Sequence, residues 1–152
     1  MKKLLALLLA CLLIYPAALA DVDYLLEDSG LTLTVPDAMT EQEPEEDDDE
    51  DLLLACVNDD ETLLMLIFCT EAEGLTLDDV QEILSEDGTV SLYGVTIING
   101  VETVYALGEE DGSAYVAYFH VSGAALTQFM FWYMDEEAAS LSGEIMATLR
   151  TE

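Results

Sequence analysis

The chain has 152 residues, enough for one domain with its own core, and carries 33 acidic residues against three basic ones. Its formal net charge of −30 excludes electrostatic binding to nucleic acid or to an anionic lipid surface. Because 52% of the residues are apolar and fall in strand-like runs, the composition also excludes an acidic disordered chain. The acidity indicates either a cationic partner or metal ions, or more simply solubility outside the cell in salty surroundings.

The first twenty residues predict a secretory signal peptide. Two lysines precede an apolar run of about eleven residues that ends before Pro16, and a small-x-small motif closes at Ala20. The run is shorter than the roughly 20 residues that span a bilayer, so we expect cleavage after Ala20 and no membrane insertion. The mature domain, residues 21–152, is then secreted or otherwise extracytoplasmic. Residues 8–11 resemble a lipobox, so a lipoprotein anchored through Cys11 is the alternative.

The mature domain begins with two short predicted strands, residues 21–27 and 31–35, and Pro36 ends the second. Residues 41–51 are nearly all acidic and predict a mobile, solvated loop, because like charges at this density repel each other. The loop lacks the alternating Asp ligands, central Gly and closing Glu of an EF-hand, so we expect at most loose binding of divalent cations. The candidates for this loose binding are Glu45, Glu46, Asp47, Asp48, Asp49, Glu50 and Asp51.

Residues 52–57 and 62–69 predict a hairpin in which Cys56 lies opposite Leu63. Cys69 then lies six residues further along the second strand, about 20 Å away at ~3.3 Å per residue. A disulfide needs Cα atoms within about 7 Å of each other. Although an exported protein permits disulfides, we therefore expect two buried free thiols.

The first helix is predicted at residues 75–86. Thr76 serves as the N-cap and Asp79 completes a capping box, while Leu75 and Val80 form a hydrophobic staple. One face of this helix is apolar and is expected to be buried. Its residues are Leu77, Val80, Ile83 and Leu84.

Residues 89–134 predict a meander of four strands. Asn99 and Gly100 give the strongest hairpin signal, because both accept a positive φ. Large apolar side chains occur at both odd and even positions of these strands, which predicts a sheet with two apolar faces, each covered by other elements. Trp132 and Tyr133 are expected in the core. The expected strands are 89–98, 101–107, 114–121 and 124–134.

Residues 135–149 predict the closing helix. Acids at its start and Arg150 at its C-terminus suit the helix dipole, and Gly143 is a weak point that allows close packing on the sheet. The predicted fold class is α+β: an antiparallel sheet of about six to eight strands flanked by two helices, in a single domain.

The sequence carries little sign of chemistry. No Gly-rich phosphate loop, zinc pattern or nucleophile elbow occurs, so we expect no enzyme, no cofactor and no discrete metal site. His120 is the only histidine, and it is interpreted as a sheet residue because its neighbours of the same parity form no triad. A hydrolase that uses His120 or a cysteine is the remaining enzymatic alternative. Glu102 lies beside a hairpin turn and is expected to face solvent.

Three local patterns, at residues 29–37, 98–105 and 134–138, together resemble the PsbP-like α/β sandwich proteins, including small exported bacterial proteins of the DcrB type. The chain departs from that pattern at Met39, where the family often has a large aromatic residue after the first proline. Because the family has no shared active site, the resemblance implies an accessory or binding role and carries over no catalytic residue.

We therefore expect an exported, highly acidic, non-enzymatic binding or accessory domain whose partner is an unknown protein or another cationic molecule. The alternative is a cation-binding or salt-adapted acidic surface protein without a discrete site.

Overall fold

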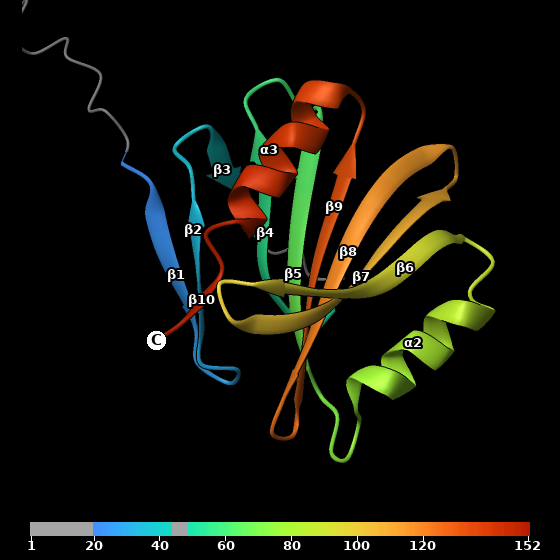
Figure 1. The fold of residues 1–152 in the computed structure, drawn as a ribbon. Helices are drawn as coiled ribbons and strands as arrows, with labels where there is room; N and C mark the ends of the chain where they lie inside the picture. The colour runs from blue at the N-terminus through green and yellow to red at the C-terminus, as the bar shows by residue number, and fades with distance from the viewer. Residues whose placement is uncertain (1–19, 44–48) are drawn as a thin grey trace, which may run out of the picture.

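The computed structural model describes residues 20–43 and 49–152. Within this part of the chain, a seven-stranded antiparallel sheet has the order β3-β4-β5-β9-β8-β7-β6, and a smaller sheet has the order β1-β2-β10 (Figure 1). The elements are β1 (Val22–Leu26), β2 (Leu31–Val35), β3 (Met39–Glu41), β4 (Leu52–Asn58), β5 (Leu63–Glu71), α2 (Leu77–Glu86), β6 (Val90–Ile98), β7 (Val101–Glu110), β8 (Ser113–Ser122), β9 (Ala125–Tyr133), α3 (Glu136–Met146) and β10 (Arg150–Thr151). The predicted signal peptide, residues 1–20 with Cys11, lies outside the described residues except for Ala20. Neither described helix is long and apolar enough to cross a membrane.

The helix boundaries follow the capping signals. Thr76 accepts a hydrogen bond from the Asp79 N–H, and the Asp79 carboxylate accepts one from the Thr76 N–H, which confirms the capping box of α2. Asp135 is the N-cap of α3, and its carboxylate accepts a hydrogen bond from the Ala138 N–H at 2.8 Å. The expected end of α3 is wrong, because the helix stops at Met146.

The chain beyond α3 forms the unpredicted strand β10. Leu149 is fully buried, and Arg150 pairs with Thr32 of β2 instead of ending the helix. The Arg150 guanidinium donates to the Asp23 carboxylate at 2.9 Å and to the Thr34 hydroxyl at 3.0 Å. The hydrogen bond from Thr34, together with Arg150, lowers the pKa of Asp23. Arg150, the only Lys or Arg among the described residues, therefore joins β10 to the first hairpin.

The start of the acidic stretch is ordered rather than a loop. Glu41 belongs to β3, an unpredicted edge strand, and pairs with Cys56 of β4. The Tyr24 hydroxyl donates to the Glu41 carboxylate at 2.9 Å, and burial together with this bond raises the pKa of Tyr24 to about 12. The loop expected over residues 41–51 therefore begins one residue later, at Gln42.

The predicted register of the β4–β5 hairpin is wrong by two residues, because Cys56 lies opposite Met65 and not Leu63. The side-chain oxygen of Asn58 accepts hydrogen bonds from the N–H groups of Thr62 and Leu63, both at 2.8 Å. This cap lengthens the turn by holding Thr62 out of the ladder.

The two faces of the large sheet carry separate apolar clusters. α3 and the small sheet cover one face of the large sheet (Figure 1). Phe129 and Phe131 lie fully buried in the cluster on this face. On the opposite face, Val80 and Leu84 of α2 pack against Val104 of β7. The expectation that Ile83 is buried is wrong, since its side chain is 60% exposed.

The β6–β7 hairpin turns at Asn99 and Gly100 with φ values of 49° and 86°, which confirms the predicted turn. The Asn99 amide also donates to the backbone oxygens of Ala147 at 2.7 Å and Leu149 at 2.9 Å. The turn therefore fastens the hairpin to the segment between α3 and β10.

Replacing Asn99 with alanine is expected to lower the free energy of unfolding by about 2 kcal/mol, because it removes two hydrogen bonds and leaves a side chain at positive φ. Asn99→Gly keeps the positive φ without strain and is expected to lose about half as much. Urea denaturation of the parent protein and the two variants measures both losses of unfolding free energy. Equal stability of the alanine variant and the parent protein would refute this role of Asn99.

Candidate functional site

Part of one face of the large sheet is not covered by a helix. α2 packs against β6, β7 and β8, and Leu126 of β9 packs against the same cluster. The rest of this face of β4, β5 and β9 is left outside both buried clusters. We call this area the open face. The open face consists of Ala55, Val57, Leu64, Leu66, Phe68, Met130 and Trp132, all half-buried or exposed.

Trp132 lies at the centre of a cross-strand row on the open face. It is opposite Leu64 of β5 on one side and Tyr115 of β8 on the other. The Trp132 and Tyr115 ring centroids are 6.1 Å apart with an interplanar angle of 51°. Tyr115 is buried, and its hydroxyl bonds to the Thr89 hydroxyl at 2.8 Å. The indole is thus supported by a fixed neighbour while Leu64 remains 38% exposed.

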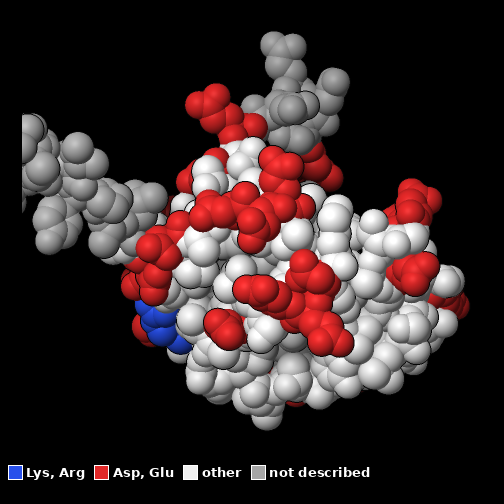
Figure 2. Space-filling view, turned by 90° about the horizontal axis from the view of Figure 1, so that it is seen from above, with Lys and Arg blue, Asp and Glu red and all other residues white. Residues whose placement is uncertain are grey.

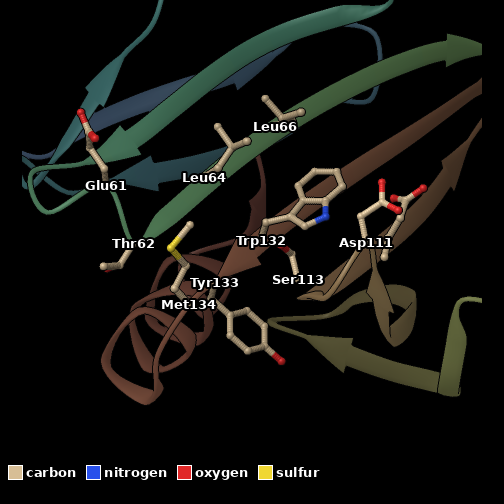
Figure 3. Close-up of a pocket in the computed structure, with 10 residues that line it drawn as sticks. Glu61, Thr62, Leu64, Leu66, Asp111, Ser113, Trp132, Tyr133 and Met134 are labelled. Carbon is tan, nitrogen blue, oxygen red and sulfur yellow. The ribbon is translucent and has the colours of Figure 1, made fainter.

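An apolar groove of about 410 Å³ opens at the end of this face that lies beside the β4–β5 and β7–β8 turns. Its apolar lining is provided by Leu64, Leu66, Trp132 and Met134, the last with its side chain 79% exposed. Figure 3 shows Leu64, Leu66 and the Trp132 indole on the same side of the sheet, whereas Tyr133 points away from them. The groove has the size and apolar character of protein ligand sites.

The rim of the apolar groove is acidic. Glu61 lies in the β4–β5 turn, and Glu110 and Asp111 lie at the β7–β8 turn, so carboxylates stand on two sides. Among the described residues Arg150 is the only Lys or Arg, and it is bound to Asp23 in the small sheet. Figure 2 shows groups of acidic side chains separated by uncharged surface, with one basic patch. The groove therefore combines apolar contact with attraction for cations.

The acidic loop offers no discrete metal site in the part that the structure describes. The carboxylate of Asp49 accepts a hydrogen bond from the Asp51 N–H at 3.0 Å, which forms a local turn with Glu50. Within residues 20–43 and 49–152, no group of three His, Cys, Asp or Glu side chains is placed to hold a metal ion. The other candidates, Glu45, Glu46, Asp47 and Asp48, lie outside the described residues.

His120 and Cys69 occupy one cross-strand row but are not adjacent. Thr127 of β9 lies opposite both, so two strand spacings, about 9–10 Å, separate them. The His120 Nδ1 bonds instead to the Glu102 backbone oxygen at 2.8 Å, and the Glu102 side chain faces solvent as expected. The row thus provides no direct contact between a nucleophile and a base.

Cys56 and Cys69 are both free, as expected, but Cys69 is half-buried rather than buried. Burial raises the pKa of Cys69, and burial followed by the nearby Glu41 carboxylate raises that of Cys56 to about 11. At neutral pH both groups are therefore protonated, which is the opposite of an activated thiolate.

Solved structures show the same fold at low sequence identity. The PsbP protein of the cyanobacterium Synechocystis sp. PCC 6803 (CyanoP) has a TM-score of 0.63 and 9% identity, covering 88% of this chain and 93% of its own. A Bacteroides thetaiotaomicron protein has a TM-score of 0.59 and 18% identity over 86% of this chain. This chain spans 48% of the length of the Bacteroides protein. The Ran-binding protein Mog1p of Saccharomyces cerevisiae has a TM-score of 0.52 and 11% identity, covering 86% of this chain and 95% of its own.

The chain therefore has the PsbP/Mog1-like fold, which confirms the expected α+β class and the expected resemblance. No protein-family model matches the chain, and the comparison with curated proteins found no match. At these identities the likeness shows the fold alone.

Trp132 is half-buried on the open face, whereas the sequence pattern predicts it in the core, so the open face is not predicted from the sequence. A signal was present in the helix length. α2 has ten residues and is about 15 Å long, whereas seven strands at ~4.8 Å spacing make a sheet about 29 Å wide. One such helix cannot cover a whole face of the sheet.

Proposed function

We propose that the chain is an exported, non-enzymatic binding domain, and that it binds a basic, amphipathic segment of a partner protein in the apolar groove. The observation that carries the proposal is the apolar lining of the groove, formed by Leu64, Leu66 and Trp132, between two acidic turns. Burying these side chains contributes about 25 cal/mol per Å², and the rim carboxylates attract Lys and Arg side chains. A yeast protein of this fold is named as a Ran-binding protein, so the fold is compatible with protein recognition.

Calorimetric titration of the full chain with three matched peptides of about twelve residues tests this proposal. One peptide alternates Lys and Leu, the second replaces every Leu with Ser, and the third replaces every Lys with Glu. We expect the Lys–Leu peptide to bind at least tenfold more tightly than the Lys–Ser peptide in 0.15 M salt, and the Glu–Leu peptide not to bind. The apolar contacts account for the first difference and charge complementarity for the second.

A groove variant separates the apolar groove from general acidity. The double variant Leu64→Ser/Leu66→Ser keeps every charge and is expected to lose the preference for the Lys–Leu peptide while binding the Lys–Ser peptide unchanged. Leu25→Ser is the matched control, because Leu25 is a similarly exposed strand leucine in the small sheet. Equal binding of the Lys–Leu and Lys–Ser peptides would contradict the proposal and favour the acidic surface without a discrete site.

A further inference from the structure

The edge strand β6 differs from every other sheet edge in the described chain. Residues 89–100 contain no charged residue, although 24% of the chain is charged. β3, at the opposite edge, has three residues and includes Glu41, while β1 carries Asp23. Edge strands are usually short, charged or bulged, which prevents unintended pairing. From Leu92 to Ile98, β6 is long, uncharged and in continuous register with β7.

The apolar side chains of β6 are open to solvent. Tyr93, Val95 and Ile97 alternate along one face of the strand, and Ile97 is 68% exposed. Leu92 is exposed on the other face. Such a continuous apolar edge offers side-chain burial to a strand that pairs with it.

The turn geometry gives the direction of the backbone groups. A two-residue turn makes its flanking residues, Ile98 and Val101, a hydrogen-bonded pair. The hydrogen-bonded pairs alternate along the strand, so the N–H and C=O groups of Tyr93, Val95 and Ile97 point away from β7. No strand in the described chain pairs with this outer side of β6.

We propose that β6 pairs antiparallel with β6 of a second copy of this chain, in a register centred on Val95. This register places Val95 opposite Val95 of the second copy, Tyr93 opposite Ile97, and Leu92 opposite Ile98. Every outward-pointing backbone group between residues 93 and 97 then has a partner, and each of these side-chain pairs is apolar. The interface is isologous, as twofold symmetry requires.

Charge favours a second copy over a basic partner at this edge. A basic segment would find no carboxylate on residues 89–100, whereas two copies meet there without bringing like charges into contact. The rest of the acidic surface repels another copy, so β6 is the edge at which repulsion is weakest. Because one strand pair buries less than the ~1,200 Å² typical of a stable interface, the dimer is weak and concentration-dependent.

Sedimentation equilibrium of the full chain in low and high salt tests the proposal. The dimer fraction is expected to rise as salt screens the repulsion between copies. Peptide binding in the apolar groove is expected to fall with salt, so failure of one proposal is distinguishable from failure of the other. A chain that stays monomeric at about 1 mM in 1 M NaCl would overturn the dimer.

Val95→Lys places two like charges directly opposite each other at the twofold axis and is expected to weaken dimerisation at least tenfold. Leu25→Lys is the control, because it makes the same charge change at an exposed position of β1. In the parent protein, hydrogen exchange at the Val95 N–H is expected to slow with rising protein concentration. Equal dimerisation of the two variants, or exchange at Val95 that is independent of concentration, would contradict the proposed register.

Discussion

Replacing Phe131 with alanine is expected to lower the free energy of unfolding by about 4 kcal/mol. Phe131 is fully buried on β9, between Met65 of β5 and Val116 of β8. Its ring packs edge-on against Tyr118, with centroids 6.4 Å apart and an interplanar angle of 84°. The substitution leaves a cavity beneath α3 and the small sheet, where the surrounding strands are too constrained to collapse.

Urea denaturation followed by far-ultraviolet circular dichroism measures this loss. The matched control is Leu64→Ala, on the neighbouring strand but on the open face, where part of the side chain is already in water. We expect the control to cost less than about 1 kcal/mol. If both variants lost a similar amount of unfolding free energy, the two faces of the sheet would be equally buried, which would contradict the open face.

Gly108→Ala is expected to be the most damaging glycine substitution, with a loss of about 3 kcal/mol. A Cβ at position 108 would lie 2.5 Å from the Thr89 backbone oxygen and 2.5 Å from the Tyr115 ring. The Thr89 oxygen is fixed by the Glu109 N–H at 3.1 Å, and Tyr115 is held by its hydrogen bond to the Thr89 hydroxyl. Neither the Thr89 oxygen nor the Tyr115 ring can move away without breaking its hydrogen bond.

Gly143→Ala is the contrasting substitution and is expected to stabilise the protein by about 0.5–1 kcal/mol. No heavy atom lies within 4 Å of a Cβ at position 143, and the residue is in the interior of α3, where alanine is favoured. The sequence-based expectation that Gly143 permits close packing on the sheet is therefore wrong. Thermal unfolding of both variants should show shifts of opposite sign, and shifts of the same sign would refute this account.

The features that the sequence predicted are those that local interactions determine. The N-cap of Thr76 and the turn at Asn99 and Gly100 depend on residues within one or two turns of each other, so they are readable from the chain. The alternation of apolar residues also predicted the β1–β2 hairpin and the four-strand meander. The strands β7 and β8 are longer than the expected 101–107 and 114–121, because the turn between them consists only of Asp111 and Gly112.

The features that the sequence did not predict depend on contacts between distant segments. Arg150 lies beyond α3 and pairs with Thr32. Glu41 pairs with Cys56 and accepts a hydrogen bond from Tyr24. No local sequence pattern predicts either of these contacts. Trp132 has apolar neighbours of both parities, so alternation alone could not say which face of the sheet lacks cover. The open face emerges only when the position of α2 over β6, β7 and β8 is known.

The fluorescence of Trp132 gives the most direct test of the central claim, because it is the only tryptophan in the chain and lines the apolar groove. Addition of the Lys–Leu peptide to the full chain is expected to shift the emission to shorter wavelength and to protect the indole from acrylamide quenching. Neither change is expected with the Leu64→Ser/Leu66→Ser variant. Calorimetrically saturated binding that leaves the emission and quenching of Trp132 unchanged would contradict the assignment of the groove as the recognition site.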